Sequence, residues 1–330
     1  MGASANSLIN RPILASIHTQ AFQHNLSRVR QLAPESKIWA VIKARAYGHG
    51  FAAALKGLSS TDGFALLDIQ DAVWLREQGW QGRILLLEGL FHENELDLAQ
   101  ELHCDLVAHC ETQVDWLERY AKNVHKTMSV FLKMNTGMNR LGFKPNAYRT
   151  AFHRLHAAGY RMHHMTHFAN ADQIDRLPSV GGQLDLFEQT IEGLQAPTSL
   201  ANSAAILWHR NALGDWVRPG IMLYGCSPFP EQSAQAIGVR PVMTLCSGVI
   251  AVQSVAPGAR VGYSGTFVAP RAMRIGVVAC GYADGYPRHA PGGTPILVNG
   301  RRTQTLGRVS MDMLFVDLDD LPEEIGRAHV

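Results

Sequence analysis

The sequence predicts an α/β plus all-β protein of two domains, with an N-terminal (β/α)8 barrel over residues 12–238 and a mainly antiparallel β domain over 239–330. The chain has 330 residues, more than the roughly 250 residues of a typical barrel domain. Short β-rich runs recur at intervals of roughly 20 to 30 residues, which is the spacing of βα units. After Gly238, turn signals replace the helical linkers.

Eight β-rich runs precede residue 230, and the segments that link them have helical patterns. In the linker 70–79, for example, Ala72, Leu75 and Gly79 fall on one predicted helical face. Most runs are continuously apolar, as in parallel strands that are covered on both sides. A doubly wound sheet has a similar linear pattern, but the count of eight favours a closed barrel. The predicted strands are Lys37–Lys43, Asp62–Asp68, Arg83–Gly89, Asp105–His109, Ser129–Asn135, Met162–Ala169, Thr198–Ser203 and Val217–Gly225.

The last third of the chain has a sequence pattern typical of an antiparallel sheet. Pro-Gly, Gly-Gly and Asn-Gly turn signals separate its strand-like runs, and no helical pattern intervenes. We expect a domain boundary near 237–240, with residues 1–11 packing near the β domain. The predicted strands are Val242–Leu245, Val249–Val252, Arg274–Val278, Thr294–Val298 and Phe315–Leu318.

Composition argues against several classes of partner. The chain has 30 Lys and Arg against 28 Asp and Glu, so no strong field attracts nucleic acid or an anionic membrane. No apolar window is long enough to span a bilayer, and residues 1–12 lack a signal-peptide pattern. The five cysteines have no metal-type spacing, and the histidines of 163–167 have no Cys or carboxylate at ligand spacing. We therefore predict a cytoplasmic protein without a metal site.

A lysine closes the first predicted strand, at the end of a barrel where active sites lie. Apolar surroundings can lower the pKa of the Lys43 amine and make it available for a Schiff base. A lysine that extends from a strand end into water is the alternative for Lys43 taken alone.

Two further strand ends indicate a phosphate site beside this lysine. Strand seven ends in Asn202-Ser203-Ala204-Ala205, and strand eight carries Arg218-Pro219-Gly220-Ile221. Barrels often bind phosphate between these two loops, and strand eight neighbours strand one. A phosphate near a Schiff-base lysine suggests pyridoxal phosphate. Taken alone, Ser203 is equally consistent with an ordinary helix N-cap.

The run Lys43-Ala-Arg-Ala-Tyr-Gly-His-Gly resembles the cofactor-lysine motif of bacterial alanine racemases, which are fold type III pyridoxal-phosphate enzymes. Further motifs agree, occur in family order and cover essentially the whole chain. These motifs lie at 133–143 (KMNTGMNRLGF), 167–172 (HFANAD), 218–225 (RPGIMLYG), 261–263 (VGY), 281–286 (GYADGY) and 307–312 (GRVSMD).

The resemblance implies which residues hold pyridoxal 5′-phosphate. Lys43 would form the Schiff base, and Arg218 would face the pyridine nitrogen. Because a guanidinium loses its proton only above about pH 12, that nitrogen would stay largely unprotonated, which disfavours a long-lived carbanion. The implied phosphate contacts are Tyr47, Ser203, Gly220 and Ile221, and the remaining implied cofactor contacts are Arg140, His167 and Asn202.

The resemblance also implies that L-alanine and D-alanine are interconverted by two bases on opposite faces of Cα, for peptidoglycan synthesis or alanine catabolism. Lys43 would serve one face and Tyr263 the other, with His167 beside the tyrosine and Arg218 behind it. Without the resemblance, Tyr263 would be a packing aromatic and His167 a strand-end histidine with satisfied hydrogen bonds. The implied substrate contacts are Arg140, Tyr282, Met311 and Asp312, of which Tyr282 would narrow the entrance to favour alanine.

In the family the tyrosine comes from the other subunit, so the resemblance implies a head-to-tail homodimer with two shared sites. Closure within one chain remains open. Lys133 matches a lysine that some members carry as a carbamate, although Asn135 stands where an aspartate is more usual. Members continue beyond the chain's end at 326–330 with another strand and a phosphate-contacting tyrosine. We therefore expect a truncated or frame-altered reading, with an unpaired β edge and one phosphate contact fewer.

Three other functions remain as alternatives. A barrel decarboxylase using the same cofactor would carry a carboxylate where Arg218 stands. A non-catalytic pyridoxal-phosphate carrier would lack the domain that bears Tyr263. A broad-specificity racemase would normally carry an export signal, and none is visible.

Overall fold

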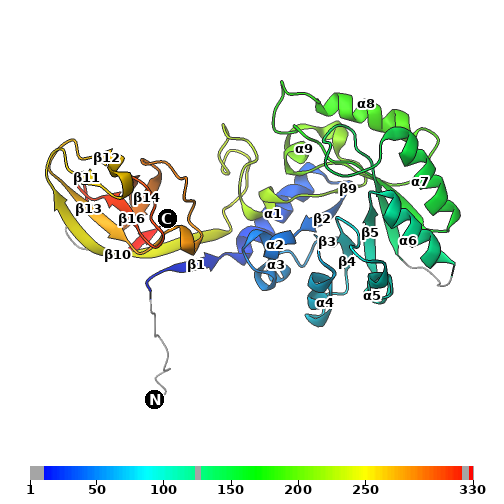
Figure 1. Ribbon diagram of the computed structural model, residues 1–330, viewed down its shortest axis with the longest axis horizontal. Helices are drawn as coiled ribbons and strands as arrows, with labels where there is room; N and C mark the ends of the chain where they lie inside the picture. Colours follow the sequence, from blue (N-terminus) through cyan, green and yellow to red (C-terminus); the bar gives the residue numbers. More distant parts are fainter. Residues whose placement is uncertain (1–10, 123–127, 322–326, 330) are drawn as a thin grey trace, which may run out of the picture. The chain divides into compact units, whose positions relative to one another are not determined.

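The computed structural model describes residues 11–122, 128–321 and 327–329. The chain forms two compact units, one from His18 to Val242 and one from the described parts of residues 1–17 and 243–330 (Figure 1). The sequence predicts that residues 12–17 belong to the barrel. In the structure Leu14–Ile17 instead forms strand β1, which pairs antiparallel with β10 (Met243–Val255) of the second unit.

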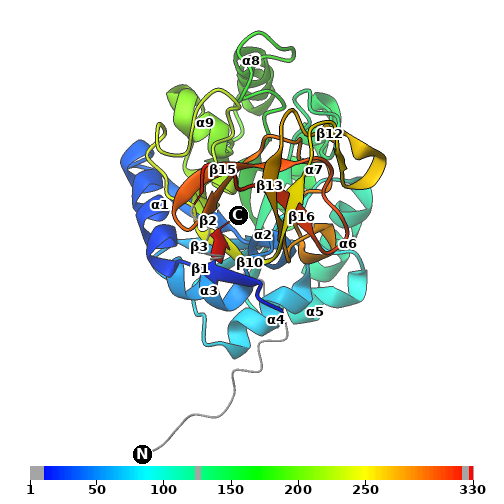
Figure 2. The same cartoon turned by 90° about the vertical axis from the view of Figure 1, so that its left-hand side faces the viewer.

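The unit from His18 to Val242 contains a closed barrel of eight parallel strands, which confirms the predicted fold class. Lys37 of the first barrel strand pairs with Trp216 of the last, which closes the ring. Helices surround the strands (Figure 2). The strands are β2 (Lys37–Val41), β3 (Gly63–Leu66), β4 (Arg83–Leu86), β5 (Cys104–Ala108), β6 (Ser129–Lys133), β7 (Arg161–Met165), β8 (Thr198–Ser199) and β9 (Trp216–Val217).

Each predicted barrel strand overlaps an observed one, but all except β5 are shorter than predicted, because the chain turns into loops or helices at their C-terminal ends. The predicted helical linker 70–79 is α4, which Asp68 caps by accepting a hydrogen bond from the Gln70 N–H. Gly79 lies beyond this helix with φ +85°, so it is not on the helical face. The α-helices are α1 (Thr19–Leu32), α2 (Lys43–Tyr47), α3 (Phe51–Gly57), α4 (Ile69–Glu77), α5 (Leu96–Glu101), α6 (Glu111–Ala121), α7 (Pro145–Ala157), α8 (Val180–Ile191) and α9 (Ser203–Trp208), and short 3₁₀ turns are η1 (Glu93–Glu95), η2 (Arg210–Ala212) and η3 (Ile221–Tyr224).

Aromatic rings and paired charges fill the N-terminal end of the barrel. The Arg83 guanidinium lies over the rings of Trp39 and Trp216, 5.2 and 4.8 Å from their centroids, and its Nε donates to Asp105 at 2.8 Å. The buried ring of His163 stacks on Phe131. Arg83 and Asp105 therefore satisfy each other, whereas Trp39 Nε1 and His163 Nδ1 are buried without a hydrogen-bond partner among the described residues. Such packing at this end serves the stability of a barrel rather than its chemistry.

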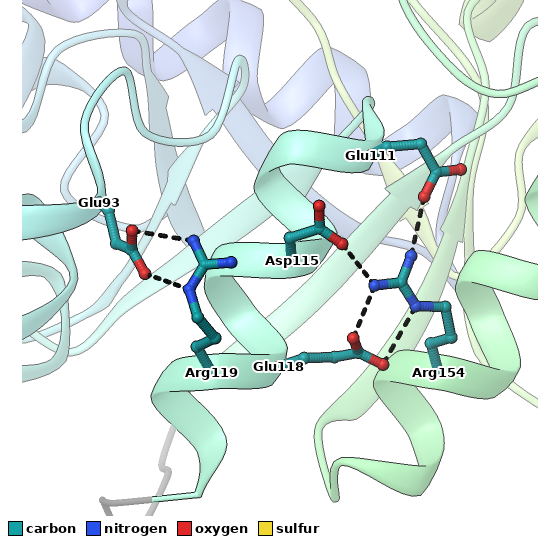
Figure 3. A network of polar contacts seen from close by, with 6 residues as sticks. All are labelled: Glu93, Glu111, Asp115, Glu118, Arg119 and Arg154. Carbon is teal, nitrogen blue, oxygen red and sulfur yellow. Dashed lines mark hydrogen bonds and ion pairs between the residues drawn. The ribbon is translucent and has the colours of Figure 1, made fainter.

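Arg154 of α7 joins three carboxylates on one face of α6 (Figure 3). Glu111, Asp115 and Glu118 are spaced so that they lie above one another on the helix. The carboxylates of Glu118 and, next, Asp115 raise the pKa of Arg154. Because these side chains remain partly exposed, the network fixes the packing of two helices more than it stabilises the fold.

The second unit is an antiparallel sheet, also as predicted. Its strand order is β1-β10-β13-β16-β15-β14-β17, and β17 pairs with β10 as well as β14. We expect an unpaired β edge near the chain's end, and this expectation is wrong because Arg327–His329 pairs on both sides. The remaining elements are β11 (Arg260–Val261), β12 (Phe267–Val268), β13 (Met273–Val278), β14 (Pro295–Val298), β15 (Arg301–Leu306), β16 (Leu314–Asp317), β17 (Arg327–His329), η4 (Tyr263–Gly265) and η5 (Tyr282–Asp284).

Two predicted strands, 242–245 and 249–252, belong to the single long strand β10. A register irregularity between Val249 and Ala251 lies inside it, so one strand can pair with β1 on one stretch and with β13 on another. The expected packing of residues 1–11 near this unit concerns residues 1–10, which lie outside the described part of the chain, and Arg11, which forms an ion pair with Asp284 at 2.7 Å.

Candidate active site

Lys43 begins an unusual turn at the C-terminal end of β2. The four residues that follow it, Ala44 to Tyr47, all have φ between 52° and 56°, a left-handed turn that L-residues rarely adopt. Such a conformation costs roughly 1–2 kcal/mol per residue, so surrounding contacts must impose it. The Ala46 N–H donates to Ile42 O, and Tyr47 stacks on Tyr224 at 4.5 Å. The turn thereby brings Lys43 and Tyr47 to the same cavity.

This cavity has a volume of about 310 Å³ and opens at the C-terminal ends of the barrel strands. Every cofactor residue implied by the sequence lines it. Four basic side chains and two carboxylates, Glu88 and Asp172, face it, so the cavity suits an anionic ligand. The basic side chains are those of Lys43, Lys133, Arg140 and Arg218.

Hydroxyl and backbone groups gather where β8 and β9 lead into α9 and η3. The buried Ser203 hydroxyl accepts a hydrogen bond from the Gly220 N–H at 2.9 Å. A Cβ on Gly220 would lie 2.5 Å from the Tyr47 hydroxyl oxygen, so only glycine leaves this space open. Ile221 begins η3, where a backbone N–H has no partner within the helix. Asn202 caps α9 by accepting from the Ala205 N–H.

Arg218 is a buried guanidinium that pairs with hydroxyl, carbonyl and imidazole groups, and with no carboxylate of the described residues. It is 5% exposed and donates to Ser199 Oγ at 2.7 Å and to Thr166 O at 2.6 Å. Burial and, less strongly, the charge of Arg140 lower the pKa of Arg218 to about 9. This value remains above neutral pH, so Arg218 keeps its charge inside the cavity.

His167 accepts from this guanidinium through Nδ1, at 3.2 Å from Arg218 Nη2. Because arginine can only donate, Nδ1 carries the lone pair and Nε2 carries the proton. Burial lowers the pKa of His167 well below its ordinary value, and the charges of Arg218, Lys133 and other cavity cations act in the same direction. His167 is therefore a neutral imidazole with an Nε2–H to donate.

Lys133 is the second buried amine of the cavity. Burial, followed by the charges of Arg218 and Arg140, lowers its pKa to about 7. Asn135 is engaged elsewhere: its Oδ1 accepts from the N–H groups of Gly137 and Asn139, each at 3.0 Å. The asparagine therefore serves its own loop, an Asx-type turn.

The remaining predicted residues line a pocket of about 1020 Å³ in the β unit. Backbone bonds from Tyr282 to Ser310 and from Ala283 to Met311 hold η5 against the 310–312 loop. Tyr263 is 71% exposed and Met311 58% exposed. The structure therefore brings together Tyr263, Tyr282, Met311 and Asp312 in one pocket, and brings the barrel residues together in another.

The chain matches two family models in succession. Residues 17–228 match the alanine racemase N-terminal domain, and residues 242–330 match the alanine racemase C-terminal domain. The chain belongs to the alanine racemase family.

Alanine racemase relatives cover most of the chain. It is 52% identical to that of Polaromonas naphthalenivorans over 94% of this chain and 86% of the relative, and 52% identical to that of Burkholderia mallei over 95% and 87%. A biosynthetic alanine racemase structure from Pseudomonas aeruginosa is 44% identical with a TM-score of 0.91, covering 97% of this chain and 90% of that one. The alanine racemase structure from Acinetobacter baumannii has a TM-score of 0.92, 37% identity and the same coverage.

Sequence reasoning missed the carboxylates Glu88 and Asp172 of the alanine racemase-type cavity, although the motif at 167–172 contains the aspartate. Glu88 lies within the predicted third barrel strand, Arg83–Gly89, and belongs to no motif. Within the described residues no cluster of three metal-ligating side chains occurs. No described helix is both long and apolar enough to cross a bilayer.

Proposed function

We propose that this protein interconverts L-alanine and D-alanine with pyridoxal 5′-phosphate, using Lys43 and Tyr263 as bases on opposite faces of Cα. The observation that carries the proposal is the shared cavity of Lys43, the carboxylate-free Arg218 and the neutral His167. A decarboxylase of this fold would need a carboxylate where Arg218 stands. The product would supply peptidoglycan synthesis, or the reverse reaction would serve alanine catabolism.

The residues fit pyridoxal phosphate. Ser203, Tyr47 and the start of η3 present hydroxyl and N–H donors for the phosphate, and the missing Cβ of Gly220 leaves room for it. Lys43 supplies the amine, and Arg218 would address the pyridine nitrogen. An alanine racemase structure from Bartonella henselae with covalently bound pyridoxal phosphate has the same fold, at 24% identity and a TM-score of 0.85.

When bound, this cofactor supplies an electron-accepting ring that makes the α-hydrogen of an amino acid acidic. The amine of Lys43 then takes or returns a proton on one face of Cα. The phenol of Tyr263 does so on the other face. A free phenol has a pKa near 10 and needs help to lose its proton. The Nε2–H of neutral His167, polarised by Arg218 behind it, would donate to the phenolate oxygen and stabilise it.

We infer that the tyrosine is provided by a second subunit of a head-to-tail homodimer. Tyr263 stands 71% exposed in a pocket that carries three of the four proposed substrate contacts and no lysine. The barrel cavity carries Lys43 and the fourth contact, Arg140. Large exposed aromatics beside a pocket are typical of interaction surfaces. Tyr282 and Met311 would then close the site around a methyl side chain, while Arg140 and Asp312 flank the carboxylate.

All five cysteines are free thiols, which is typical of a reducing compartment and supports action in the cytoplasm.

Circular dichroism of alanine solutions tests the proposed function. The purified protein loaded with pyridoxal phosphate should bring L-alanine and D-alanine to the same racemic mixture. Ornithine incubated in parallel should release no carbon dioxide. Ornithine decarboxylation without alanine racemisation would replace our proposal with the decarboxylase alternative.

A further inference from the structure

Gln183 is a buried polar side chain to which the proposed mechanism gives no role. It belongs to the first turns of α8 and is 0% exposed. Its Oε1 accepts from the Ala169 N–H at 2.9 Å, and its Nε2 donates to His167 O at 3.2 Å and to Thr136 Oγ1 at 2.7 Å. The orientation of the amide is fixed, because an N–H must face an oxygen and a carbonyl must face a donor.

These bonds begin a one-way chain of donors. Thr166 Oγ1 donates to Met134 O at 3.0 Å, because a carbonyl can only accept. The Thr136 hydroxyl must then donate to Thr166 Oγ1, 2.7 Å away, while it accepts from Gln183. Every member of the chain is buried, so no water competes for these groups.

The chain of donors and Arg218 both hold the segment that carries His167, through different groups. Arg218 holds Thr166 O and the imidazole Nδ1 of His167. Gln183 holds His167 O and the Ala169 N–H. Residues 166–169 are therefore clamped between a guanidinium inside the barrel and an amide on an outer helix. Arg218 thus holds the imidazole and the peptide before His167, and Gln183 holds the two peptides after it.

We propose that Gln183 is a positioning residue of the active site, which keeps the Nε2–H of His167 directed at the phenol of Tyr263. This inference rests on the proposed function, because it requires His167 to assist the tyrosine base. Gln183 itself touches neither substrate nor cofactor. Its substitution should therefore slow proton transfer at the tyrosine face and spare the lysine face.

The chain offers a matched control in Gln113 of α6. Gln113 is also buried, and it makes the same number of bonds to the loops of the barrel mouth: it accepts from the His109 N–H at 3.0 Å and donates to Glu88 O at 2.8 Å and Leu90 O at 3.1 Å. None of these bonds reaches His167. Gln183→Met and Gln113→Met therefore remove equivalent buried bonds, and only one removes the clamp on residues 166–169.

Hydrogen exchange of the loaded protein gives the first readout. In Gln183→Met the amide of Ala169 should lose its protection, because its acceptor is gone. In Gln113→Met the amide of His109 should lose protection instead, and Ala169 should match the wild type. Should Gln183→Met fail to fold, Gln183→Glu keeps an acceptor for Ala169 but cannot donate to His167 O, and it takes the place of the methionine variant in the kinetic test.

Primary deuterium isotope effects on kcat/KM give the decisive readout. Both enantiomers have the same free energy, so their kcat/KM values stay equal and cannot reveal which face has slowed. With α-deuterated alanine, Gln183→Met should raise the isotope effect for the enantiomer whose hydrogen faces the phenol and lower it for the other. We expect kcat to fall about tenfold to a hundredfold, as when outer hydrogen-bond partners of metal ligands are removed. Gln113→Met should leave both isotope effects at their wild-type values.

Isotope effects in Gln183→Met that stay at wild-type values, or change equally for both enantiomers, would overturn the positioning role. Wild-type protein and Tyr263→Phe are measured in the same series. If the wild type does not racemise alanine, the proposed function fails. If the wild type racemises alanine but the Gln183 variants give the same isotope effects as the Gln113 control, the proposed function stands and only the positioning role fails.

Discussion

The barrel cavity and the β-unit pocket hold their functional groups in opposite ways. In the cavity, Arg218 and His167 are hydrogen-bonded to each other, and Arg218 is also bonded to the backbone. In the pocket, Tyr263 and Met311 are 71% and 58% exposed. The comparison indicates that the barrel half of the proposed site is preorganised, whereas the functional side chains of the β half remain exposed.

The largest effect should follow from removing the lysine of the cavity. Lys43→Ala should abolish racemisation, because it removes one base and the amine that anchors the cofactor. Borohydride reduction followed by mass spectrometry should show a cofactor adduct on the wild-type chain and none on this variant. Lys37→Ala, at the other end of the barrel beside Trp216, is the control and should retain the adduct. An adduct that persists in Lys43→Ala would place the anchor elsewhere.

Preorganisation of the cavity can be broken at Arg218. Arg218→Gln should lower kcat by about a hundredfold to a thousandfold, the usual effect of removing one fixed donor near developing charge. Arg83→Gln is its counterpart at the opposite barrel end, where the guanidinium pairs with Asp105. That variant should lower the free energy of unfolding by about 1.5 to 3 kcal/mol, the range for hydrogen bonds to charged groups, and leave kcat unchanged. Equal losses of kcat in both variants would contradict a special role for Arg218.

Buried histidines should make barrel stability depend on pH. Burial, reinforced by the charge of Arg83, lowers the pKa of His163 from 6.5 to about 4. Below pH 6.5 the unfolded chain binds a proton at His163, whereas the folded chain binds it only near pH 4. The free energy of unfolding therefore falls as the pH drops through this window. The slope is about 1.4 kcal/mol for each pH unit.

His163→Leu should flatten this pH dependence in denaturant titrations. His289, exposed at the rim of the β-unit pocket, provides the control, and His289→Leu should leave the slope as it is. An unchanged slope in His163→Leu would show that His163 is protonated in the folded barrel.

The smallest effect we expect is the change in the free energy of unfolding caused by Tyr263→Phe. Because Tyr263 is mostly exposed, Tyr263→Phe should change the free energy of unfolding by less than about 0.5 kcal/mol, as for surface substitutions in general. The same variant should lose α-deuteron exchange from one enantiomer only. A large loss of stability would show that the phenol serves the fold of its own unit.

The sequence predicts the barrel well because its signals are local. Continuous apolar runs and helical linkers recur eight times, and the motifs at the strand ends follow directly from that spacing. The pairing of Leu14–Ile17 with β10 was not predictable, because those partners are more than 200 residues apart and short strands carry little pattern. The left-handed turn after Lys43 was also missed, since Ala44, Arg45 and Ala46 give no local sign of positive φ.

The residues of the candidate site also differ in how far local sequence predicts their roles. Residue types at strand ends indicate Lys43 and Ser203 from chemistry alone, whereas Tyr263 depends on the family resemblance. Gln183 carries no motif: its importance arises from three bonds to segments that only the folded barrel brings together. The direction of a hydrogen bond is a property of the fold, and sequence patterns do not contain it.

Hybrid dimers test the shared site most directly. Lys43→Ala and Tyr263→Phe subunits with different affinity tags are co-expressed, and the doubly tagged protein is assayed for racemisation. In a twofold dimer with sites shared between subunits, one of two sites is intact, so we predict about half of the wild-type activity from two inactive parents. Hybrids as inactive as both parents would show that each chain completes its own site.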